Sequence, residues 1–153
     1  MTNNMTVLQQ VFDRAGVLQE VSEARLEGAP HLVTALRLRF ENLSLIVSAD
    51  GETDTVLLAV GDSTDDPGVV QVRVSESAPW SSIIGLGLRW GWELTNHQGY
   101  TDGVRFEFAD PDRAVSQEIE LIVAASTLRL YFCVPGDRLP SKPRSRRAVG
   151  KST

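Results

Sequence analysis

The chain has 153 residues, of which 42% are hydrophobic and 23% charged, and a single cysteine. This composition is typical of one soluble globular domain with its own core, and one cysteine excludes an internal disulfide. Residues 1–137 hold nine basic and twenty acidic residues, a net charge of −11. So acidic a body counts against nucleic acid or an anionic membrane as the main partner.

The C-terminal residues 138–153 differ sharply from the rest, with six basic residues and no acidic one. Prolines, serines and the lack of an apolar period predict a disordered tail that offers only weak contacts to phosphates and that is dispensable for folding from Lys142 onward. The predicted domain therefore covers residues 1–137. No apolar run has the length of a membrane span and the N-terminus lacks a signal-peptide pattern, so we expect a cytoplasmic protein that does not enter membranes.

The first expected element is an N-terminal helix capped by Asn3 or Asn4. Its apolar positions, from Leu8 to Ala15, follow helical spacing, and Gly16 suits the position after a helix end. Residues 17–27 alternate imperfectly and predict an edge strand.

Residues 32–60 predict a meander of antiparallel strands. A two-residue turn at residues 41–42 would place Leu38 opposite Leu45, and a type I′ turn at residues 50–51 would place Leu45 opposite Val56. Both turns put the same apolar face toward the core.

An aromatic hairpin is expected further on, after a short helix near Trp80 that Ser77 would cap. Opposing Trp92 to Phe106 and Trp90 to Phe108 would bury both tryptophans in the core. Glycines alternate with the apolar residues of the first strand, which indicates close packing on its second face.

A last hairpin is expected from residues 118–134. A turn at residues 125–126 would pair Val123 with Leu128 and Leu121 with Leu130. The order of elements lacks strand–helix–strand alternation. The sequence therefore predicts an α+β fold: a single domain with one mostly antiparallel, twisted β-sheet, an N-terminal helix and a short helix near Trp80.

Several motifs together resemble a known family. They are Pro-Trp-Ser at residues 79–81, Trp-Gly-Trp at 90–92, Asn-His-Gln-Gly-Tyr-Thr-Asp-Gly at 96–103 and Phe-Glu-Phe at 106–108. The pattern is similar to that of an uncharacterised family of small bacterial proteins, over most of residues 30–134. The resemblance implies no activity; it marks residues 96–103 as a family feature.

The loop of the aromatic hairpin is the candidate binding site. It holds Asn96, His97, Gln98, Tyr100 and Asp102, and rigid strands commonly present binding groups on such loops. Tyr100 would anchor a partner or ligand, with His97 and Gln98 orienting it. The alternative is that Asn96 and Asp102 close the turn and Tyr100 packs onto the domain.

No other pattern in the sequence predicts chemistry. Neither histidine has a nucleophile or metal ligands nearby. The acidic residues at 50–54 have the alternate spacing of a calcium loop, but Gly51 falls too early and no glutamate ends a twelve-residue loop. We expect no catalytic residues, no metal and no cofactor.

Two classes of function remain open. The first is a non-enzymatic module that binds another protein, with an immunity- or antitoxin-like role as one form. The second is a small-molecule binder or unrecognised enzyme, with a pocket between the sheet and the Trp80 helix lined by Tyr100, His97 and Glu107.

Overall fold

The structure is a computed structural model that describes residues 3–62, 66–112 and 116–132. The expected disordered tail lies outside these residues. The α+β class, the antiparallel strands, the N-terminal helix and the short helix at Trp80 are all confirmed. In chain order the elements are α1 (Asn4–Arg14), β1 (Leu18–Leu26), β2 (Ala29–Phe40), β3 (Ser44–Asp50), β4 (Thr55–Val60), β5 (Val69–Arg73), a 3-10 helix (Trp80–Ser82), β6 (Gly87–Thr95), β7 (Thr101–Ala109), β8 (Ser116–Ala124) and β9 (Thr127–Phe132).

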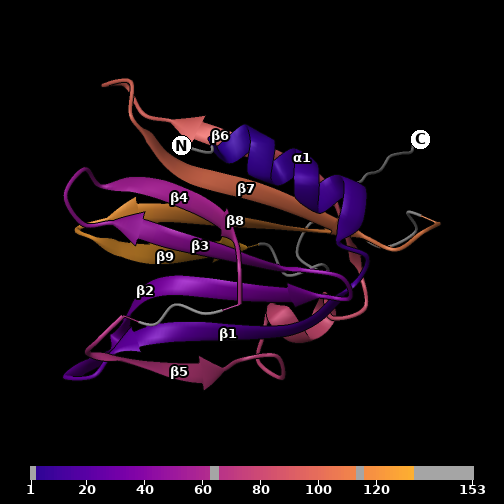
Figure 1. The fold of residues 1–153 in the computed structure, drawn as a ribbon, viewed down its shortest axis with the longest axis horizontal. Helices are drawn as coiled ribbons and strands as arrows, with labels where there is room; N and C mark the ends of the chain where they lie inside the picture. The colour runs from indigo at the N-terminus through magenta and orange to yellow at the C-terminus, as the bar shows by residue number, and fades with distance from the viewer. Residues whose placement is uncertain (1–2, 63–65, 113–115, 133–153) are drawn as a thin grey trace, which may run out of the picture.

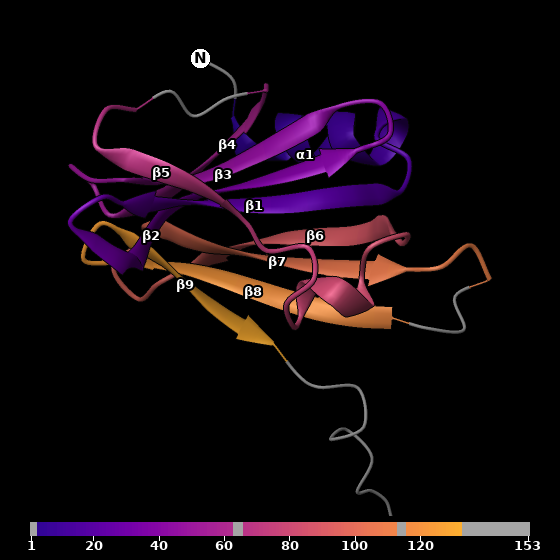
Figure 2. The same cartoon turned by 90° about the horizontal axis from the view of Figure 1, so that it is seen from below.

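The strands form two sheets rather than one continuous sheet. A five-stranded sheet has the order β4-β3-β2-β1-β5 and a four-stranded sheet the order β6-β7-β8-β9, with every pairing antiparallel. Figure 2 shows them as two facing layers. Each sheet is apolar on the side facing the other, so the core lies between them. The alternation of apolar and polar residues within one hairpin does not indicate which hairpins share a sheet, so it could not predict the division into two sheets.

Two predicted hairpin registers are confirmed. Leu38 lies opposite Leu45 in the β2–β3 pair, and Val123 lies opposite Leu128 in the β8–β9 pair. The β8–β9 turn at residues 125–126 has two consecutive positive φ angles, +53° and +66°. Such angles define the type I′ turn, whose twist matches that of the strands.

The predicted two-residue turn at residues 50–51 is wrong. Asp50 pairs with Thr55, so a four-residue loop joins β3 to β4 and Leu45 lies opposite Val60 instead of Val56. The shift amounts to an even number of residues. Because side chains alternate with period two, Val56 still faces the core, where it is buried.

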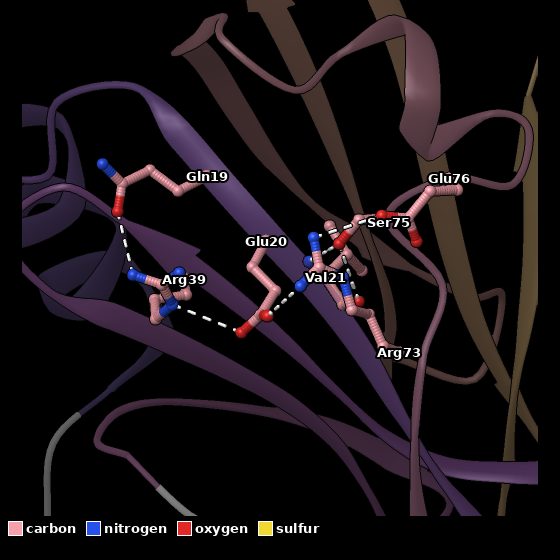
Figure 3. A network of polar contacts seen from close by, with 7 residues as sticks. All are labelled: Gln19, Glu20, Val21, Arg39, Arg73, Ser75 and Glu76. Carbon is pink, nitrogen blue, oxygen red and sulfur yellow. Dashed lines mark hydrogen bonds and ion pairs between the residues drawn. The ribbon is translucent and has the colours of Figure 1, made fainter.

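β1 is an interior strand, contrary to the expected edge strand, because it pairs with β2 on one side and β5 on the other. Beyond β5, Ser75 continues the pairing with its side chain. Its hydroxyl oxygen accepts the Val21 N–H at 2.9 Å and lies 3.3 Å from the Val21 oxygen (Figure 3). On the outer side, Glu20 links Arg39 to Arg73 across the three strands.

The N-terminal helix closes one side of the sandwich. Asn3 caps it, its side-chain oxygen accepting the Thr6 N–H at 2.8 Å. The helix packs on β4 and β6, one edge strand of each sheet (Figure 1). Asn4 completes the β4 edge, because its amide donates to the Val56 oxygen at 3.1 Å and accepts the Leu58 N–H at 3.0 Å.

The short helix brings Trp80 into the core, where the indole is 2% exposed. Ser77 does not cap it with its side chain; Pro79 occupies the cap position without a side-chain bond. Within the described part of the chain, no helix is long and apolar enough to cross a membrane.

Candidate functional site

A bulge in β6 decides which way the tryptophans point. Leu88 pairs with Phe108, but Trp90 pairs with Glu107, so the residue between them, Arg89, interrupts the register. Beyond it the pairing is shifted by one residue from the predicted one. A one-residue shift turns every following side chain to the opposite face.

The prediction that Trp90 and Trp92 belong to the core is therefore wrong. Their side chains are 52% and 40% exposed on the outer side of the four-stranded sheet. Gly91 takes the inward position instead, against Leu8 of α1. The sequence did contain a signal for this orientation, the glycine between the two tryptophans. The strand face that carries the glycine packs closely against the helix, so the tryptophans lie on the opposite face.

We call the outer side of the four-stranded sheet the aromatic face. Tyr131 of β9 also lies there and is 51% exposed. The register of the four strands places on this face Trp90, Trp92, Arg105, Glu107, Glu118, Glu120 and Tyr131.

One row across the aromatic face runs from Trp92 through Arg105 and Glu120 to Tyr131. Arg105 donates from two nitrogens to one Glu120 oxygen, at 2.9 and 2.8 Å, and its guanidinium lies 5.9 Å from the Trp92 ring centroid. The ion pair and the cation–π contact hold this planar cation between the Glu120 carboxylate and the Trp92 ring. Glu93 pairs with Val104 in this register and does not lie opposite Arg105.

The neighbouring row has a different electrostatic character. Trp90 lies opposite Glu107, and Glu107 lies opposite Glu118. Arg89 reaches Glu107 at 3.7 Å, whereas the exposed Glu118 carboxylate has no hydrogen bond or ion pair within the described residues. Like charges directly opposite each other are unfavourable, so this row would be stabilised by an added cation.

The 96–102 loop is ordered by its first residue. The Asn96 side-chain oxygen accepts the N–H groups of Gln98 and Tyr100, at 2.9 and 3.2 Å, and its amide donates to Asp102 at 3.2 Å. Gly99 has a φ of +90°, which a glycine adopts without strain. Asn96 and Asp102 therefore close the turn, as the alternative interpretation expects.

Tyr100 nevertheless does not pack down onto the domain; it is 52% exposed. It borders an open groove of about 510 Å³ between this loop and the β3–β4 loop. Three carboxylates line the groove, and no lysine or arginine does. The lining residues are Glu52, Thr53, Asp54, Asn96, Gln98, Tyr100, Asp102 and Val123.

The other members of the predicted pocket lie apart. His97 is exposed but is not among the residues that line the groove. Glu107 lies on the aromatic face beside Arg89, and the buried Trp80 lines a separate small cavity together with Leu121 and Leu130. The structure thus unites four of the five loop residues in one groove, without Glu107 or the Trp80 helix.

The described residues hold no cluster of three or more histidine, cysteine or carboxylate side chains that could bind a metal ion. The site offers groups for contact: half-exposed aromatic rings, a guanidinium held in place and a carboxylate, Glu118, that has no partner among the described residues. These groups bind ligands by stacking, cation–π contact and ion pairing.

Comparison with known proteins identifies the family of the chain and gives no information on its activity. No curated protein and no solved structure matches the chain. One family model matches residues 1–136, which is nearly the whole predicted domain and stops short of the basic tail. The chain therefore belongs to the family of unknown function designated DUF6334.

Proposed function

We propose that the protein is a small, non-enzymatic binding module that engages another protein through its aromatic face. The observation that carries the proposal is the exposure of Trp90 and Trp92 side by side on a rigid, paired sheet. Burying aromatic side chains stabilises a protein, so such side chains left exposed on the folded surface are available for burial against a partner. Contiguous exposed aromatic surface therefore marks interaction sites.

The chemistry of the aromatic face fits a protein partner. Tryptophan, tyrosine and arginine are the residues that contribute most binding energy at protein interfaces, and here Trp92, Arg105 and Tyr131 lie in one row. The charge-paired Arg105 keeps its geometry before binding, which lowers the entropy lost on association. Glu118 supplies a contact for a lysine or arginine of the partner.

The setting we propose is the cytoplasm of a bacterial cell. The acidic domain and the resemblance to small bacterial proteins support it. A protein that masks a basic partner, as immunity proteins and antitoxins do, is one form that such a module takes. Charge complementarity would speed its association.

Affinity capture with matched variants tests the proposal. The tagged full chain is compared with a Trp90→Ala, Trp92→Ala double variant and with Leu57→Ala, which changes a 47% exposed side chain of the other sheet. A partner that the chain and Leu57→Ala retain and the double variant loses supports the aromatic face. We expect its Kd to rise at least about a hundredfold, since central aromatic residues each contribute about 2 kcal/mol or more. A partner held equally by all three contradicts the proposal.

A second candidate is a small-molecule site in the 96–102 groove. The exposed Tyr100 and the three carboxylates favour a small organic cation, which would stack on the ring and pair with the acids. Native mass spectrometry of the protein from its source cells tests for a retained ligand. A ligand lost from Tyr100→Ala but not from Trp90→Ala would assign binding to the groove instead.

A further inference from the structure

We propose that the basic segment of residues 138–153 docks on the aromatic face of its own chain, over Glu118 and Trp90. The consequence for binding rests on the proposed function: the segment covers surface that a protein partner needs, and so weakens the partner's apparent affinity. Three independent features support this occupant: the exit point of the chain, the charge of the row beside it and the reach of the segment.

The exit point is set by the β8–β9 register. Ile119 lies opposite Phe132, the last described residue, so the described part of β9 ends next to Glu118. Figure 2 shows β9 as the edge strand of its layer at this point. A shallow groove of about 380 Å³ begins there, lined by Arg105, Glu118, Ile119, Glu120, Tyr131 and Phe132.

The charge of the row fits a cationic occupant. Glu107 and Glu118 lie opposite each other, and only Glu107 has a cation, Arg89, beside it within the described residues. Arg105 is already ion-paired with Glu120. Arg129, the remaining cation of this side, lies opposite Ile122 near the far turn and not beside Glu118. Among the described residues, this end of the face therefore has an acid without an ion pair, Glu118, in the same row as the exposed indole of Trp90.

The segment can reach this end of the face without strain. The five residues from 133 to 137 span at most about 18 Å when extended. The distance from β9 to β6 is three strand spacings, or about 14 Å. Arg138 and the residues after it can therefore reach Glu118 on β8 and Trp90 on β6.

The composition of the segment matches the surface. It carries six cations and no acid, and cations bind to carboxylates and to the faces of indole rings. One exposed ion pair contributes little, so the proposal requires several contacts made together. A short tether keeps the segment at an effective concentration in the millimolar range, which makes such weak contacts sufficient.

Nuclear magnetic resonance of the full chain tests the docking. The indole N–H signals of Trp90 and Trp92 report on the aromatic face, and that of the buried Trp80 is the internal reference. The main variant replaces all six cations by glutamine: Arg138, Lys142, Arg144, Arg146, Arg147 and Lys151. We expect it to shift the Trp90 signal and leave that of Trp80 in place.

Salt and single carboxylates provide matched controls. Raising NaCl to about 0.5 M, where the Debye length is only about 4 Å, should reproduce the shift of the six-glutamine variant. Glu118→Gln should reproduce much of it, whereas Glu27→Gln, an exposed glutamate between β1 and β2, should not. A Trp90 signal identical in the full chain and the six-glutamine variant overturns the proposal.

Dilution distinguishes a segment that docks on its own chain from one that is supplied by a second copy of the protein. Docking within one chain leaves the Trp90 signal unchanged over a hundredfold dilution, whereas a concentration-dependent shift would assign the segment to a second copy and overturn docking in cis. Once a partner is known, the six-glutamine variant should bind it about twofold to tenfold more tightly. Equal affinity would overturn the competition alone. Loss of the partner in the Trp90→Ala, Trp92→Ala variant still tests the proposed function separately.

Discussion

Gly91 of β6 and Leu8 of α1 meet so closely that a Cβ atom on Gly91 would lie 3.0 Å from Leu8 Cδ2. Only a glycine leaves the helix this room without a shift of Leu8. The contact therefore determines the direction of β6: its glycine faces the helix, and Trp90 and Trp92 on either side face solvent.

Replacing Gly91 by valine should lower the free energy of unfolding by about 1–3 kcal/mol, although valine favours strands, because its branches would collide with Leu8. Gly61→Val is the control, since a Cβ there meets no atom within 4 Å. Urea unfolding measures both. A Gly91→Val protein as stable as the Gly61→Val protein would show that α1 can move away.

The tryptophans should differ strongly in their effect on stability. Trp80→Ala should lower the free energy of unfolding by about 3–5 kcal/mol, because it empties a buried site. Trp90→Ala and Trp92→Ala should each cost less than about 1 kcal/mol, because both residues are already about half exposed to water. A loss near that of Trp80→Ala in either variant would contradict the outward register.

Asn4 should matter through its contact with β4. Asn4→Ala removes the partners of the Val56 oxygen and the Leu58 N–H and should cost about 1–3 kcal/mol. Hydrogen exchange at the Leu58 amide should become faster. In Asn3→Ala, which removes only the helix cap, we expect a loss of about 0.5–2 kcal/mol and a smaller effect on that amide. Equal exchange in the two variants would mean that Asn4 does not protect the strand.

The turn at residues 125–126 offers a stabilising change. Ala125 has a φ of +53°, a conformation that costs an alanine about 1 kcal/mol and a glycine almost nothing. Ala125→Gly should therefore raise the free energy of unfolding by about 0.5 kcal/mol once the larger entropy of the unfolded glycine is included. Ala124→Gly, in the extended end of β8, should lower it. Thermal unfolding distinguishes the two signs.

The sequence was sufficient where a hairpin has one short turn and one apolar face. Leu38 pairs with Leu45 and Val123 with Leu128 as predicted, because any slip by one residue would expose both apolar rows. For the same reason, predicting a two-residue turn instead of the four-residue β3–β4 loop did not change which residues were expected in the core. Its true register differs by an even number of residues, so Val56 remains inside.

The aromatic hairpin could not be solved in the same way. Trp90 opposite Phe108 is a good pair by composition, and nothing local indicates the bulge at Arg89 that replaces it with Leu88 opposite Phe108. The deciding contact is with Leu8, about eighty residues earlier in the chain. The aromatic face was missed because hydrophobic alternation identifies two sides of a strand but does not say which side meets the core.

The attachment of α1 has a consequence for how the molecule assembles. Asn4 forms hydrogen bonds with β4, more than fifty residues later in the chain, and with Glu93 of β6, eighty-nine residues later. The helix can therefore complete its contacts only after both partner strands have been synthesised and have reached their final positions. A helix that is synthesised before both of its partner strands is therefore among the last elements to find its place, and until then the β4 edge and the inward side of β6 stay open to unwanted pairing.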